Sequence, residues 1–158
     1  MIDFMVVALP RSGTAWTANL LTTDDSVCLH ESFLQFTIDQ LDDLQMPHKL
    51  GIAETAGAFF PEEVNKHSAK KLLITRPLDE INASAQKLNL PVLTEHAASL
   101  LNDIDGYRIE YRNLFDYKEM SKAFEFLLNK KLDPIRYALL CGMRVENIEA
   151  VNLVRNMF

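Results

Sequence analysis

The loop-forming residues near the N-terminus have the types and order that could bind an anion. Residues 10–16 read Pro-Arg-Ser-Gly-Thr-Ala-Trp and follow a short apolar run. Gly13 has no side chain to block a close backbone approach, Ser12 offers a hydroxyl donor, and Arg11 offers a bidentate cation. A helix that begins at Thr14 would add unpaired N–H groups and the positive end of its dipole. These parts predict an oxyanion-binding loop; a serine-glycine turn capped by Thr14 is the alternative.

The elements that must position this loop are strands that alternate with helices. Short apolar or alternating runs predict strands over residues 4–9, 26–30, 71–75 and 107–111, and a short strand plus loop over 51–60. Helical periodicity predicts helices over residues 14–21, 31–44, 78–88, 93–104 and 120–128, and two more before and after Gly142. Alternating strands and helices pack as right-handed crossovers. We therefore expect an α/β fold, a three-layer α/β/α sandwich with a mainly parallel sheet, like that of the P-loop NTPases.

Ligands of such sheets bind beyond the carboxyl ends of the strands, where residues 11–14 would lie. The loop is not a Walker A sequence, because it lacks the earlier glycine and the lysine after the second glycine. The strand over 71–75 also ends in Thr75-Arg76 instead of an aspartate that could organise Mg²⁺. Metal-dependent ATP chemistry is therefore disfavoured.

The bulk composition predicts one ordinary globular domain over residues 1–158. The net charge of −6 argues against a nucleic-acid partner, which selects for a basic face. No run is long and apolar enough for membrane insertion, and the histidines do not cluster with cysteines, so we predict no bound metal. With only two cysteines, a reducing, cytoplasmic location is the better expectation.

The chain resembles the sulfotransferases that use 3′-phosphoadenosine 5′-phosphosulfate (PAPS). The 5′-phosphosulfate loop of that family reads P-[RK]-S-G-T-[TS]-W or close to it, and residues 10–16 match except at Ala15. A second family landmark is an arginine that ends a central strand, followed by a serine eight positions later. Arg76 and Ser84 have this spacing. The stretch 76–84 looks like the R-x-x-x-E-x-x-x-S version of short bacterial members.

The resemblance implies a donor site for PAPS as co-substrate. Its residues would be Arg11, Ser12, Gly13, Thr14, Ala15, Trp16, Arg76 and Ser84. Ala15 removes one hydroxyl that the family usually has there, and the basic-glycine segment that clamps the 3′-phosphate in cytosolic members is not evident. Trp16 could pack against the adenine, with a place in the core as the alternative.

The resemblance also implies transfer of a sulfuryl group to a hydroxyl or amine acceptor, which could be a glycan, a small molecule or a peptide. Glu31 and His30 end the second predicted strand, and one of them would act as general base, with Glu31 favoured. Arg11 would neutralise the leaving phosphate. The alternative for Glu31 is an acid that complements a helix dipole. Because neighbours on a strand face opposite ways, we expect only one of the pair to point at the donor.

Two other function classes stay open at the level of sequence. One is a P-loop kinase of small molecules or nucleotides, against which the missing lysine and aspartate count. The other is a non-catalytic nucleotide-binding domain of the same fold. Four aromatic residues could line an acceptor pocket or pack in the core: Phe33, Phe36, Phe59 and Phe60. The oligomeric state is not predicted.

Overall fold

Five parallel strands form the central sheet of the protein, whose computed structural model describes residues 1–143. The strands are β1 (Ile2–Ala8), β2 (Ser26–His30), β3 (Lys49–Glu54), β4 (Lys70–Thr75) and β5 (Tyr107–Glu110). They lie in the order β2-β3-β1-β4-β5, and each neighbouring pair is parallel. The carboxyl ends of all five strands therefore meet at one edge.

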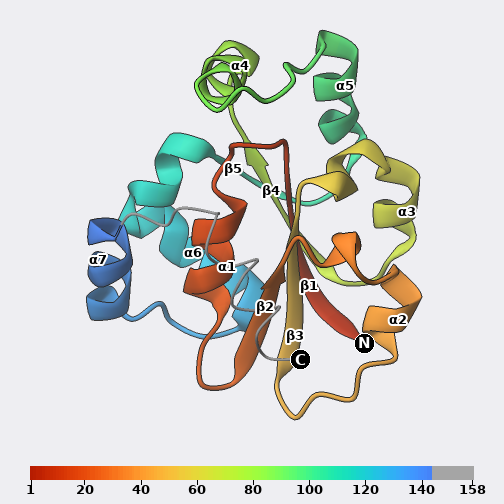
Figure 1. Cartoon of the computed structure of the whole chain (residues 1–158). Coiled ribbons are helices and arrows are strands. Elements are labelled where there is room, and N and C mark those ends of the chain that lie inside the picture. The colour runs from red at the N-terminus through yellow and green to blue at the C-terminus, as the bar shows by residue number, and fades with distance from the viewer. Residues whose placement is uncertain (144–158) are drawn as a thin grey trace.

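Helices cover both faces of this sheet (Figure 1). The α-helices are α1 (Thr14–Leu21), α2 (Ile38–Asp42), α3 (Pro61–Lys66), α4 (Leu78–Gln86), α5 (Glu95–Ser99), α6 (Tyr117–Leu128) and α7 (Pro134–Gly142). Within residues 1–143, four 3₁₀ turns lie between these elements: η1 (Ser32–Leu34), η2 (Ala56–Phe59), η3 (Leu100–Asp103) and η4 (Tyr111–Phe115). Helices α1, α6 and α7 lie on one side and α2 and α3 on the other, which confirms the predicted three-layer α/β/α class. Over residues 1–143, no helix is long and apolar enough to cross a membrane.

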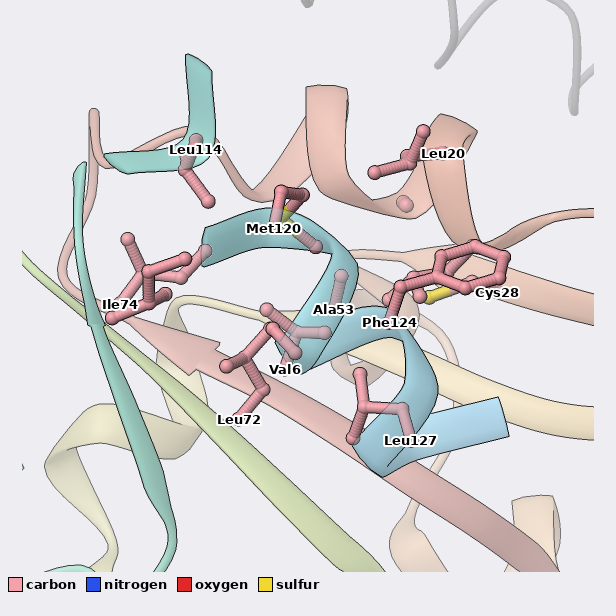
Figure 2. Packing of buried hydrophobic residues seen from close by; sticks show 14 of the residues in the cluster. Val6, Leu20, Cys28, Ala53, Leu72, Ile74, Leu114, Met120, Phe124 and Leu127 are labelled. Atoms are coloured by element: carbon pink, nitrogen blue, oxygen red, sulfur yellow. The ribbon is translucent and has the colours of Figure 1, made fainter. Parts of the chain in front are cut away.

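Each face of the sheet has its own apolar core. Under α1 and α6 the core includes Val6 of β1 and Leu72 of β4, and Met120 and Phe124 of α6 pack on them (Figure 2). The opposite core alternates with it along the same strands, as the period of two requires. Strand β1 is buried along almost its whole length, with Asp3 as its exposed residue.

Two of the predicted helices are broken in the structure. The helix predicted over residues 31–44 is replaced by η1 and α2, because Glu31 adopts a left-handed backbone (φ 53°) and Thr37 starts α2 anew. The Thr37 side chain accepts from the Gln40 N–H, and the Gln40 side chain accepts from the Thr37 N–H, which is a complete capping box.

The prediction over residues 93–104 was likewise too regular, since the α-helical part is α5 and η3 follows it. Leu88, predicted to face inward, lies beyond the end of α4 and is half exposed. The helix predicted after Gly142 lies outside the described residues.

Strand β3 was underestimated as a short strand plus loop, although it lies between β2 and β1 and is almost wholly buried. Glycine weakens the strand pattern in the sequence, but Gly51 has a packing reason. A Cβ at Gly51 would come within 2.0 Å of the Phe4 ring, and Phe4 is fully buried. The side chain of Phe4 occupies the space that the glycine leaves.

We predict that Gly51→Ala destabilises the fold by about 1–3 kcal/mol, because the added methyl group overpacks the core against Phe4. Urea denaturation measures the change in the free energy of unfolding. The matched control is Gly57→Ala, where a Cβ makes only ordinary van der Waals contacts at 3.5–3.7 Å. Equal stability losses for the two variants would contradict the packing argument.

Candidate functional site

The loop between β1 and α1 lies at the carboxyl edge, at the centre of the sheet. Arg11 (φ 67°) and Gly13 (φ 88°) both have left-handed backbones, and no side chain caps the N-terminus of α1. The Thr14 hydroxyl is instead hydrogen-bonded to His30 Nε2 at 3.1 Å. Thr14 therefore does not cap this turn, and no side-chain cap occupies the first amides of α1, which keep their donor capacity.

Ser12 in the same loop has an unusual hydroxyl group. Its residue is fully buried, and Ser12 Oγ has no hydrogen-bond partner among residues 1–143. Buried polar groups are nearly always paired, because an unmade hydrogen bond costs about 1–3 kcal/mol. A hydroxyl of this kind next to open helix amides is suited to bind a ligand oxygen.

The loop after β1 contacts the segment that contains Arg76 and Ser84 directly, although more than sixty residues separate them in the sequence. Arg11 Nε donates to Ser84 Oγ at 3.3 Å, and Arg76 Nη1 donates to the carbonyl oxygen of Arg11. The two guanidinium groups and one hydroxyl thus lie around the end of β1. Proximity of two arginines favours a ligand with more than one negative charge.

A second space opens beside Arg76, between the ends of β4 and β5. The guanidinium lies over the Tyr111 ring at 4.2 Å from its centroid, and Arg76 Nε pairs with Glu80 Oε2 at 3.1 Å. The pocket here measures about 380 Å³. It is lined by Thr75, Arg76, Pro77, Glu80, Glu110, Tyr111 and Arg112. Sequence reasoning assigned no chemistry to Tyr111, which only the fold brings against Arg76.

His30 and Glu31 lie together at the end of β2, contrary to the expectation that they face opposite ways. The reason is the left-handed backbone of Glu31, which ends the strand geometry and brings Glu31 Oε1 to 3.6 Å from His30 Nε2. Glu31 Oε2 also accepts from the Thr55 hydroxyl at 3.1 Å. The pKa of His30 is lowered, because the effect of burial exceeds the opposing effect of the nearby Glu31 charge.

Sequence reasoning missed Glu54, the last residue of β3. The residue is 1% exposed, and its pKa is raised to about 7 from an ordinary 4.5. Burial is the main cause; the Glu31 charge adds to the rise, and the hydrogen bonds from Ser32 and Phe33 oppose it. Oε1 accepts hydrogen bonds from Ser32 and from the Phe33 N–H. The only signal in the sequence was an acid that closes an apolar strand.

Trp16 packs in the core instead of facing the open loop. It is 6% exposed, its ring lies against Phe115 and Tyr137, and its indole N–H donates to the Leu140 carbonyl oxygen at 3.1 Å. Of the two roles expected for Trp16, these contacts favour packing in the core over packing against an adenine. Ala15, on the first turn of α1, keeps its backbone donor.

The aromatic residues considered for an acceptor pocket are only partly gathered. Phe33, Phe36 and Phe60 line a pocket of about 580 Å³ next to α2 and α3, while Phe59 packs against the core. Phe33 follows Glu31 by two residues, so this pocket begins close to the carboxyl edge. Asp42 and His67 also line it.

Comparison with known proteins supports the fold. No family model matches the sequence, and no curated protein matches it in sequence. Among solved structures, the chain is similar to the mouse sulfotransferase SULT7A1 complexed with PAP, with a TM-score of 0.56 and 17% identity. The match covers 89% of this chain and 63% of the mouse chain, so this chain spans less than two thirds of that protein. The protein thus has a sulfotransferase-like α/β fold.

We predict that Glu54 makes the fold less stable as the pH rises from about 5 to 7. The folded state keeps a proton on Glu54 up to about pH 7, whereas the unfolded chain releases it near 4.5, so the native state binds more protons in this interval. The contribution is about 2–3 kcal/mol and is constant above that interval. It is measured by urea denaturation at several pH values.

Glu54→Gln should remove this part of the pH dependence. The control is Glu62→Gln on the exposed side of α3, which deletes the same charge and should leave the slope as in the wild type. Parallel stability curves for the wild type and Glu54→Gln would refute the assignment.

Proposed function

We propose that the protein is a sulfotransferase that uses PAPS, acting as a single domain of residues 1–158. The observation that carries the proposal is the contact of Arg11 with Ser84 and of Arg76 with the Arg11 carbonyl oxygen. It joins the two sequence motifs into one site at the carboxyl edge of a sulfotransferase-like fold. That the similar mouse protein is complexed with PAP supports the same class of nucleotide here.

The residues present fit a nucleotide with two separate anionic groups. The open amides of α1, the unpaired Ser12 hydroxyl and Arg11 would bind the 5′-phosphosulfate. Arg76 and Ser84 would bind the 3′-phosphate. The pocket of about 380 Å³ beside Arg76 and Tyr111 would take the nucleoside, since it adjoins the same guanidinium.

The chemistry proposed is in-line transfer. The acceptor oxygen or nitrogen forms a bond to sulfur while the bond from sulfur to the phosphate oxygen breaks, and the acceptor proton goes to Glu31. Arg11 stabilises the charge that develops on the leaving phosphate. Glu31 is suited to the base role because its carboxylate lies beside His30, which is bonded to Thr14 of the donor loop. Donor and base are therefore linked by one short series of contacts.

We predict that 3′-phosphoadenosine 5′-phosphate (PAP) stabilises the protein and that ATP with Mg²⁺ does not. At a concentration one hundred times the Kd, a ligand adds about 2.7 kcal/mol, which raises the Tm of a domain of this size by about 5–10 °C. A thermal-shift titration with each nucleotide measures the effect. Stabilisation by Mg-ATP alone would support a kinase, and no response to either nucleotide would support a non-catalytic domain.

Arg11→Ala and Arg76→Ala should each abolish the PAP-dependent shift. Arg11→Ala removes the one cation proposed for the 5′-phosphosulfate, and Arg76→Ala leaves the 3′-phosphate with Ser84 alone. Lys118→Ala on the exposed side of α6 is the control, because it removes a positive charge far from the motifs in sequence and leaves them intact. The comparison uses variants whose Tm without nucleotide equals that of the wild type. Normal PAP binding by Arg76→Ala would contradict the assignment.

We predict that Glu31→Gln binds PAP normally but loses transfer by about 10²–10⁴-fold, the range that a general base contributes. The amide keeps the contact with Thr55 but cannot accept the acceptor's proton. Transfer is followed with labelled PAPS and a panel of phenols, alcohols, amines and sugars, with Glu62→Gln as the charge-matched control. Unchanged turnover would rule out Glu31 as the base and direct attention to His30.

A further inference from the structure

Glu54 is the one acidic side chain that is buried within residues 1–143, and the reaction proposed above gives it no part. It is the last residue of β3 and lies opposite Val7 of β1 in the sheet register. A buried carboxyl group at the carboxyl edge, beside the proposed base, requires an explanation. Burial of a charge without a partner costs several kcal/mol, so such residues are rare away from functional sites.

The two oxygens of Glu54 have opposite surroundings. Oε1 accepts from the Ser32 N–H, from the Ser32 hydroxyl and from the Phe33 N–H at 3.2 Å. All three donors belong to the start of η1, so Oε1 anchors this turn to the end of β3. Oε2 is buried and has no hydrogen-bond partner in the described part of the chain. A carboxyl group held in this way places its proton on Oε2 when it is neutral.

The anchored turn begins directly after Glu31, which has a left-handed backbone. That conformation costs about 1–3 kcal/mol in a residue other than glycine and persists only where neighbours hold it. The Glu31 N–H donates to the Ala53 carbonyl oxygen at 3.0 Å, and Glu31 Oε2 accepts from Thr55. Residues 53, 54 and 55 thus hold Glu31 and its following turn from three successive positions.

The charges around Glu54 have a second consequence. The titratable groups that face it are the Glu31 carboxylate and the Cys28 thiol, and His30 lies behind Glu31. Two neighbouring carboxyl groups resist simultaneous ionisation. Burial is the main cause that raises the pKa of Glu54 to about 7, and the Glu31 charge raises it as well.

We propose that Glu54 is a positioning residue for Glu31: its buried carboxyl group anchors the turn Ser32–Leu34 and so holds the Glu31 carboxylate beside His30 and the donor loop. The assignment of Glu31 as base rests on the proposed function, whereas the coupling between the two carboxyl groups does not. Glu54 itself need not touch the donor or the acceptor.

The kinetic test compares Glu54→Ala and Glu54→Gln in the full chain. Glu54→Ala releases the turn, so kcat should fall by about 10–100-fold while the Kd for PAP changes less than about twofold, because the donor loop is untouched. Glu54→Gln retains an oxygen acceptor for η1 and should restore kcat to within about threefold at pH 6. It should also lose the change in kcat/KM that titration of Glu54 imposes between about pH 6 and 8.

Unchanged kcat in Glu54→Ala, or a pH profile of Glu54→Gln identical to that of the wild type, would overturn the proposal. If Glu54 had only a structural role, the pH profile of Glu54→Gln would match that of the wild type, because the amide preserves the fold. Glu62→Gln serves as the charge-matched control and should behave as the wild type in both assays.

A titration of the carboxyl carbons by ¹³C NMR separates this inference from the proposed function, because it requires no turnover. In the wild type, the Glu31 signal should show an inflection at the midpoint of Glu54, near pH 7. That inflection should vanish in Glu54→Gln and persist in Glu62→Gln. A wild type that binds no PAP but shows the inflection would refute the sulfotransferase and retain the coupling. A Glu31 signal with the same pH dependence in the wild type and in Glu54→Gln would refute the coupling.

Discussion

Strand β1 is hydrogen-bonded to a parallel neighbour on each side and covered by helices on both faces, and the candidate site depends on this position. Because β3, β1 and β4 run in the same direction, Glu54, the loop after Ala8 and Arg76 emerge at one edge of the sheet. Chain segments more than twenty residues apart thus reach the same edge because the direction of the strands brings them there. The apolar cores on the two faces, which bury β1, supply the free energy that keeps these strand ends in register.

Arg11 and Glu31 at this edge both adopt left-handed backbones. Neither residue type favours that conformation, so the surrounding structure must hold it. The Arg76 guanidinium donates to the carbonyl oxygen of Arg11, and the Ala53 carbonyl oxygen accepts from the N–H of Glu31. Ala53 belongs to β3, and Arg76 directly follows β4, so both groups come from the two strands next to β1. Local strain at the site is thus compensated by the sheet.

Much of the architecture could be predicted because it follows from short-range patterns. The bounds of α1 and β2 agree with the expected ranges 14–21 and 26–30. The breaks in the helix expected over residues 31–44 could not be seen, because apolar periodicity continues across a residue that the fold forces out of helical geometry. Gly51 hid β3 for a similar reason: the glycine is required by the Phe4 ring, which lies far away in the sequence.

By itself, the sequence determined the alternation of strands and helices, the residue types of the loop after β1, and the spacing of Arg76 and Ser84, because each depends on residues within about ten positions of one another. Only the tertiary structure decided that Arg11 contacts Ser84, that Glu31 turns toward His30, and that Glu54 is buried beside them. Those facts depend on strand order and on the desolvation of particular groups. Neither is encoded in local periodicity, since pairing across a sheet is chosen by the packing of the whole chain.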